Sequence, residues 1–135
     1  SSTLTWGMGA GYGSTKLTLD SAGNLTAAGN VTAYSDKRLK TNIKPLENAL
    51  EKVTSLTGVS FKRTDTNENG IGLIAQDVQQ VFPEAVHEAN DEQKTLSIAY
   101  GNLIGPLVEA IKELKAENDL LKQRINALEE KANVI

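Results

Sequence analysis

The sequence predicts an α+β fold in three parts, with a small mixed helix/strand domain over residues 35–100 at its centre. A β-rich segment over residues 1–34 precedes this domain, and a long coiled-coil helix over residues 101–135 follows it. Three observations lead to this prediction. They are a short glycine-containing repeat near the N-terminus, a mixture of helical and alternating apolar spacing in the middle, and a sustained heptad pattern at the end.

The composition indicates a small core and excludes several classes of function. Hydrophobic residues make up 39% of the chain and aromatic residues only 4%, so we expect apolar surface to be buried between subunits as well as within one chain. The net charge of -3 gives no reason to expect binding to nucleic acid or to an anionic membrane. No cysteine is present for disulfides or thiolate metal sites, and no apolar run approaches the ~20 residues of a membrane span.

The N-terminal segment resembles a piece of a longer repetitive β-structure. Residues 16–20 alternate as in a short strand, and residues 23–27 (GNLTA) are echoed by residues 29–33 (GNVTA). One apolar residue per repeat cannot build a core within one chain, so such repeats need neighbours on which to stack. A flexible polar linker is the alternative. The regular recurrence of Leu17, Leu19, Leu25 and Val31 favours the repeat.

The first half of the middle part predicts a helix and two strands. Pro45 suits the first turn of a helix, apolar residues from Leu46 to Leu56 follow helical spacing, and Gly58 suits the stop. Residues 59–63 alternate as a strand. Residues 67–70 contain an Asn-Gly turn signal, and residues 71–75 read as a short buried strand.

The second half of the middle part predicts a short helix and a hairpin. Residues 76–82 have helical character, and Pro83 ends the helix. Residues 86–88 and 95–98 are predicted to pair as two strands across the polar residues 89–93.

The C-terminal part has apolar residues at heptad a and d positions over more than four heptads, the pattern of a coiled coil. The pairs Glu117 with Lys122, and Arg124 with Glu129, have opposite charges at g and e' of parallel chains in register. A single amphipathic helix packed on its own domain is the alternative. Isoleucine at a, leucine at d and the polar Asn118 at a favour two chains slightly over three.

Chemistry is predicted at the border between the first two parts, where Ser35 is followed by four basic residues within nine positions. A serine hydroxyl becomes a nucleophile when a neighbouring base takes its proton. Lys40 can be that base only as the neutral amine. Like charge on nearby basic residues and burial on assembly would both favour that form.

The spacing of Ser35 and Lys40 requires a turn or a second chain. Residues five apart lie on opposite faces of a strand and far apart around a helix. A solvated basic junction is the alternative. No set of histidine and carboxylate residues has metal-ligand spacing, so neither a metal nor a cofactor is expected.

Three ordered motifs resemble one known family. Residues 35–43 (SDKRLKTNI) resemble the opening motif of the intramolecular chaperone auto-processing domain. Residues 72–78 (GLIAQDV) with 81–84 (VFPE) resemble its second motif, and residues 97–100 (SIAY) resemble its third. The resemblance covers residues 35–135.

This resemblance implies a domain found at the C-terminus of phage endosialidases, tail fibres and neck appendages, with relatives in the myelin regulatory factor proteins. Such a domain forms a homotrimer, helps the preceding fibre shaft of its own polypeptide to fold, and is released by self-cleavage. The family's serine and lysine fall on Ser35 and Lys40. The resemblance therefore implies three chains where Asn118 favours two.

The resulting expectation is a Ser-Lys dyad endopeptidase that acts once on its own chain, with Tyr34, Ser35 and Asp36 at the cleavage site. If Ser35 attacks the preceding carbonyl, the break falls between Tyr34 and Ser35. A break after Ser35 would need another group or water as attacker. The implied location is a tail fibre precursor folded in the host cytoplasm, with the chaperone absent from the mature virion. The alternatives are a permanent trimerisation tip without proteolysis and a coiled-coil adaptor for another protein.

Overall fold

The structure is a computed structural model that describes residues 4–6 and 17–134. The chain forms two compact units, Ser1–Ile43 and Lys44–Ile135. The predicted domain boundaries after residues 34 and 100 remain predictions. Within the described residues, no helix is both long and apolar enough to cross a membrane.

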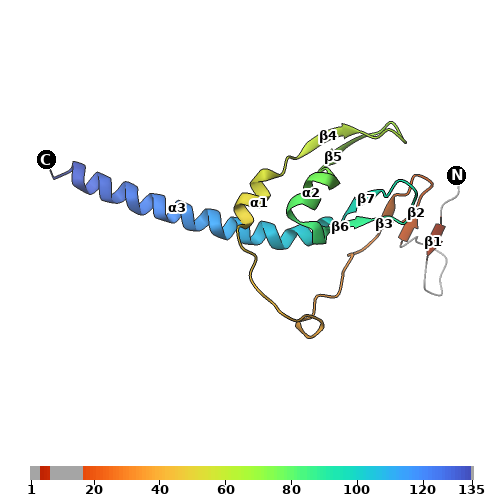
Figure 1. Ribbon diagram of the computed structural model, residues 1–135, viewed down its shortest axis with the longest axis horizontal. Coiled ribbons are helices and arrows are strands. Elements are labelled where there is room, and N and C mark those ends of the chain that lie inside the picture. The colour runs from red at the N-terminus through yellow and green to blue at the C-terminus, as the bar shows by residue number, and fades with distance from the viewer. Residues whose placement is uncertain (1–3, 7–16, 135) are drawn as a thin grey trace. The chain divides into compact units, whose positions relative to one another are not determined.

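The first unit contains a three-stranded antiparallel sheet in the order β1 (Leu4–Trp6), β2 (Leu17–Leu19) and β3 (Leu25–Ala27) (Figure 1). The strand predicted over residues 16–20 is confirmed for residues 17–19, and Lys16 lies outside the described residues. The Asp20 carboxylate closes the turn between β2 and β3 by accepting bonds from the Ala22 and Asn24 amides at 2.9 and 2.8 Å. The first repeat thus forms β3, whereas residues 29–33 have no regular structure.

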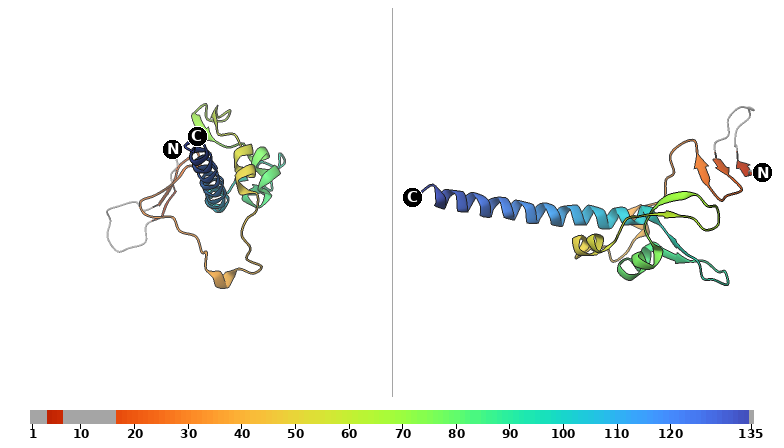
Figure 2. Two further views of the ribbon diagram at one scale, coloured as in Figure 1. Left: turned by 90° about the vertical axis from the view of Figure 1, so that its left-hand side faces the viewer. Right: turned by 90° about the horizontal axis from the view of Figure 1, so that it is seen from above.

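The second unit combines three helices with two hairpins. Its helices are α1 (Ala49–Ser55), α2 (Ala75–Val81) and α3 (Ile104–Ala132), and the short 3-10 turns η2 (Pro83–Ala85) and η3 (Tyr100–Leu103) precede β6 and α3. The hairpins are β4 (Val59–Lys62) with β5 (Asn69–Gly72), and β6 (Val86–Glu88) with β7 (Leu96–Ile98). Both α1 and α2 lie beside the N-terminal half of α3, whose C-terminal half extends past them (Figures 1 and 2). The predicted mixed helix/strand unit with a long C-terminal helix is confirmed.

The core of this unit is small, as the low aromatic content predicts. It is centred on Val78, Phe82, Ala85 and Leu103, with partly buried side chains from α1, β6 and β7 around it. Val78 is the buried residue of α2, and Phe82, directly after the end of the helix, is buried with it. Most of the unit's large apolar side chains stay at least partly exposed.

The predicted turn and strand around residues 67–75 are wrong in position. The β4–β5 turn lies at residues 64–67, where Asn67 takes the left-handed conformation with φ of 63°. Asn69 and Gly70 belong to β5 instead. A Cβ at Gly70 would lie 2.7 Å from the Phe61 ring, so glycine is needed here for close approach of the ring. The strand ends at Gly72, and Ile71 is 87% exposed where a buried strand was expected.

The first helix of the unit also begins later than predicted. Pro45 precedes the helix, which starts at Ala49 after Asn48 in the left-handed conformation. The N-cap residue makes no side-chain bond to the helix. Glu113 of α3 caps the helix instead. Its two carboxylate oxygens accept bonds from the Ala49 and Leu50 amides at 3.0 and 2.8 Å.

The long C-terminal helix is confirmed as α3, which has 29 residues. Its own unit packs against Pro106, Ala110 and Glu113 on one side. The predicted a and d residues lie beside this packed side and are largely exposed. These exposed residues are Ile104, Leu107, Ile111, Leu114, Leu121, Ile125 and Leu128.

Candidate active site

A single 3-10 turn, η1 (Lys37–Leu39), lies between Ser35 and Lys40. Asp36 caps it, because its carboxylate accepts a bond from the Arg38 amide at 2.8 Å. The Leu39 amide donates to the Asp36 carbonyl and the Lys40 amide to the Lys37 carbonyl, both at 3.1 Å. An aspartate followed by a short basic run therefore folds locally into a tight turn.

This turn brings together the two residues that spacing alone keeps apart. Lys40 Nζ donates a hydrogen bond to Ser35 Oγ at 2.6 Å. A strand or helix could not join side chains five positions apart, but a turn within one chain does so here. Ser35, Lys40 and the flanking residues Tyr34 and Asp36 lie in one short segment.

Arg38 and Asp36 stabilise the turn as an ion pair. Arg38 Nη2 lies 2.7 Å from Asp36 Oδ2, and Arg38 Nε donates to Oδ1 at 3.1 Å. This pairing, with the Arg38 amide, holds the pKa of Asp36 below its usual 3.8 and raises the pKa of Arg38. Lys37, Arg38 and Lys44 were expected to crowd Lys40 with positive charge. Arg38 is instead compensated by Asp36.

The serine and lysine are open to solvent in the single chain. A lysine ammonium has three donors and no lone pair, so it can donate to the hydroxyl but cannot take its proton. In this geometry the ammonium donates to the hydroxyl. A role as general base would require surroundings that favour the neutral amine.

The residues on both sides of Ser35 are exposed. Tyr34 is 98% exposed and lies in a segment without regular structure. Attack by Ser35 Oγ on the preceding carbonyl carbon would close a five-membered ring, so the two atoms need no other element to bring them together.

The second and third motifs meet within the second unit. The Leu73 amide donates to the Tyr100 hydroxyl at 3.0 Å. A Cβ at Gly72 would lie 2.6 Å from that hydroxyl, so a larger residue here would displace the Tyr100 hydroxyl from its bond. These motif residues connect the end of β5 to the start of η3 and therefore stabilise the fold. Sequence reasoning noted Tyr100 in its motif and missed this bond.

Glu113 is a second residue that sequence reasoning missed. It connects α3 to the N-terminus of α1, a few residues after the candidate active-site turn. No local sequence signal indicates this contact, because Asn48 before Ala49 is a favoured N-cap residue type, and only the structure shows that its side chain makes no bond to the helix.

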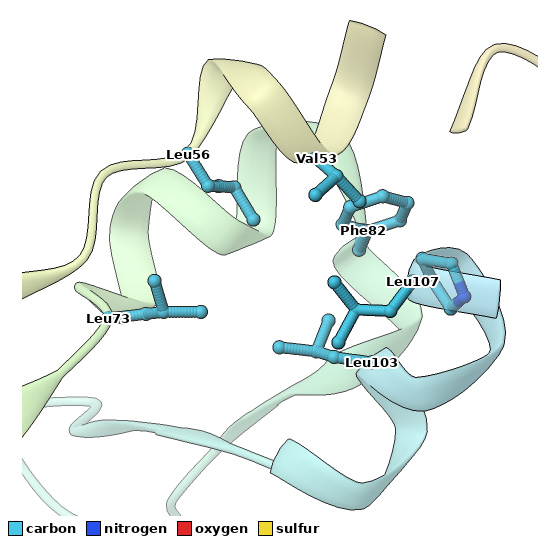
Figure 3. Close-up of a pocket in the computed structure, with 7 residues that line it drawn as sticks. Val53, Leu56, Leu73, Phe82, Leu103 and Leu107 are labelled. Atoms are coloured by element: carbon cyan, nitrogen blue, oxygen red, sulfur yellow. The ribbon is translucent and has the colours of Figure 1, made fainter. Parts of the chain in front are cut away.

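An apolar cavity of about 160 Å³ lies between α1, α2 and the start of α3 (Figure 3). The labelled side chains in Figure 3 come from all three helices and their ends and surround one hollow. They are Val53, Leu56, Leu73, Phe82, Leu103 and Leu107. No three acidic or histidine side chains gather into a potential metal site anywhere in residues 4–6 and 17–134.

Together, the fold and the turn define a small α+β domain with a serine–lysine pair at its N-terminal border and a long helix at its end. Residues 35–87 match the model of a peptidase family described as "Chaperone of endosialidase". Residues 35–87 therefore belong to a domain of the chaperone-of-endosialidase family, as the first two motifs predict, whereas the third motif lies outside the matched residues.

Known relatives of the chain are phage fibre proteins. The chain is similar to the long tail fiber protein Gp37 of Enterobacteria phage K3 and of Enterobacteria phage T2, each 41% identical over 105 residues. These matches cover 73% of this chain and 8% of each relative. A third, the Gp37 protein of Enterobacteria phage M1, is 36% identical over 101 residues, covering 69% of this chain and 40% of the relative. The chain thus spans a small part of the length of the first relatives.

Proposed function

We propose that this chain carries the intramolecular chaperone of a phage tail fibre, which assembles the chains as a homotrimer and then cuts itself free at Ser35. Ser35 is the nucleophile and Lys40 the general base. The partners are two further copies of the chain and the preceding shaft of the same polypeptide. Neither a metal nor a cofactor takes part.

The observation that carries this proposal is the 2.6 Å bond between Lys40 Nζ and Ser35 Oγ. It occurs at the first residue of the segment that matches the family. Arg38 and Asp36 stabilise the turn that makes it, so the pair is held by local structure and does not require a distant element to bring it together.

The chemistry needs only groups in this segment and one water. Lys40 takes the hydroxyl proton while Ser35 Oγ attacks the carbonyl carbon of Tyr34 through a five-membered ring. The carbon–nitrogen bond breaks, the nitrogen receives the proton from Lys40, and an ester between Tyr34 and Ser35 Oγ remains. Water then attacks the ester carbonyl and displaces Oγ. The products end in a Tyr34 carboxylate and begin with a free Ser35 amine.

Assembly supplies what the single chain lacks at this site. Both side chains of the pair are solvent-exposed, and burial by neighbouring chains would favour the neutral amine of Lys40. Cleavage then follows trimerisation. This order suits a chaperone, because β assembly between chains is slow and benefits from a clamp that raises the effective concentration of the chains.

The test is cleavage measured against concentration. The chain is refolded from denaturant over a range of concentrations, and its oligomeric state and the fraction cut are followed in the same samples. We expect cleavage to rise with the trimer fraction. A stable trimer that stays intact over days would instead indicate a permanent trimerisation module without proteolysis.

A further inference from the structure

The apolar seam of α3 is wider at its N-terminal end than further along the helix. With Ile104 and Ile111 at a, the e position that follows is Val108, and the g positions are Leu103 and Ala110. The later e and g positions carry charges: Lys115, Glu117, Lys122, Arg124 and Glu129. Leu103, directly before α3, and Ala110 are buried within their own unit. Val108 is half exposed, so it is the apolar e residue that remains available for a further contact.

The g side of this wide part borders the cavity of the same chain. Leu103 at g and Leu107 at d both line the hollow between α1 and α2 (Figure 3). Leu103 is buried, while Leu107 is half exposed at the edge of the seam. Apolar surface therefore runs without interruption from the seam into the cavity.

The charges of α3 fix which residue of a neighbouring copy would face this surface. Among the described residues, Glu117, Lys122, Arg124 and Glu129 form no ion pair within the chain, whereas Lys112 and Lys115 pair with Glu109 and Asp119. A parallel neighbour in register places Lys122 against Glu117, and Glu129 against Arg124. Each g residue then faces the e residue five positions further along in the neighbour.

The same register places Val108 of the neighbour against Leu103. We propose that the cavity between α1, α2 and α3 is a docking site for a second copy of this chain. Val108 of the second copy packs over the edge of the cavity that Leu103 and Leu107 of the first copy form. Val108 is 49% exposed in the single chain, so about half of its surface is available to another copy. The relation between g and e residues of adjacent parallel chains is the same for two chains as for three.

This contact rests on the homo-oligomer of the proposed function and adds a role to it. The cavity lies in the small core that holds α1, and α1 follows the segment carrying Ser35 and Lys40. Assembly therefore completes the packing of the domain itself as well as joining the helices.

The direct test is an isotope-filtered NMR experiment on mixed oligomers of the full chain. One half of the sample carries methyl-labelled valine and leucine, and the other half is unlabelled. We expect contacts between chains from Val108 methyls to Leu103 and Leu107 methyls. Seam contacts at Leu114 and Leu121 without any from Val108 would overturn the docking site while leaving the oligomer intact. A monomer with no contact between chains would overturn both proposals.

Val108→Asp and Leu120→Asp form a matched pair for a second measurement. Both residues are exposed on α3, at 49% and 55%, but Leu120 is at heptad position c, off the seam. By sedimentation equilibrium we expect Val108→Asp to weaken self-association roughly tenfold or more and Leu120→Asp to have little effect. Equal effects of the two substitutions would contradict a specific site for Val108.

Discussion

Lys40 Nζ lies 2.6 Å from Ser35 Oγ across one 3-10 turn whose cap, Asp36, is itself paired with Arg38. The bond has the polarity of an ammonium donating to a hydroxyl. Proton abstraction from Ser35 needs the reverse polarity, with a neutral amine accepting. The pair thus forms within one chain, and in the proposed function the assembly of the chains supplies the surroundings that activate it.

Replacing Lys40 with arginine should block cleavage. Arginine keeps the positive charge and can still donate to Ser35 Oγ, but it effectively never deprotonates and cannot serve as the base. We expect the cleavage rate to fall roughly 100-fold or more, the usual contribution of a general base. Lys37→Arg, in the same turn, is the control and should cleave at the normal rate. Rapid cleavage of the Lys40→Arg protein on a denaturing gel would exclude Lys40 as the base.

Charges in the coiled-coil seam should prevent both assembly and cleavage, although the seam lies far along the chain from Ser35. Leu114→Asp with Leu121→Asp places two carboxylates where other chains are expected to pack, and burial of unpaired charge opposes association strongly. We expect a monomer that cleaves slowly or not at all. Molecular mass by light scattering and the fraction cut are measured on one sample.

The control for the seam variant carries the same two charges on the outside of the helix. Leu120→Asp with Ala127→Asp changes two c positions and should assemble and cleave normally. Full-rate cleavage in a proven Leu114→Asp/Leu121→Asp monomer would show that the site is complete within one chain, and the proposed link between assembly and release would be wrong.

The pKa of Asp36 should lie below its usual 3.8, because the Arg38 side chain and then the Arg38 amide bond its charged form. A lowered folded-state pKa means that this stabilisation of the turn is present at neutral pH and down to the ordinary value. It is lost as the pH falls through the lowered value. The carboxyl ¹³C shift of Asp36 in an uncut Ser35→Ala protein gives the midpoint.

Arg38→Gln removes the largest cause of this shift and should move the midpoint of Asp36 upward, whereas Lys37→Gln should leave it nearly unchanged. A midpoint at or above 3.8 in the Ser35→Ala protein would mean that the ion pair does not hold the turn in solution.

Glu113→Gln should destabilise the second unit, because one carboxylate caps two amides of α1 from α3. Glutamine retains a single carbonyl acceptor and loses the charge, so we expect a loss of about 1–3 kcal/mol in the free energy of unfolding by urea. Glu109→Gln is the control, since Glu109 pairs only with Lys112 on the same helix and should cost well under 1 kcal/mol. Equal losses would show that the cap contributes little.

Much of the fold could be predicted from the sequence because local patterns determine it. The hairpin of β6 and β7, the short helix before Pro83 and the long α3 all follow from apolar spacing and stop residues close to them. The serine–lysine turn was foreseen as one of two possibilities, since spacing excludes a strand or helix but cannot distinguish a turn from a second chain.

Features that depend on distant residues could not be predicted in this way. The Asn-Gly pair at residues 69 and 70 predicts a turn locally, yet Gly70 lies in β5 and faces the Phe61 ring across the hairpin. Likewise, the preference of proline for the first turn of a helix predicts that α1 starts at Pro45. The helix begins instead at Ala49, whose amide is capped by Glu113, more than sixty residues away. Single-sequence patterns do not carry such pairings.

Determining the ends of the cleavage products is the measurement that tests self-processing at Ser35 most directly. The folded chain is incubated until cleavage is complete, and the products are separated and analysed by N-terminal sequencing and intact mass. We expect one fragment beginning with Ser35 and one ending with Tyr34. The Ser35→Ala protein should form the same oligomer by light scattering and remain whole. New ends elsewhere, or the same ends in the Ser35→Ala protein, would contradict Ser35 as the nucleophile that cuts its own chain.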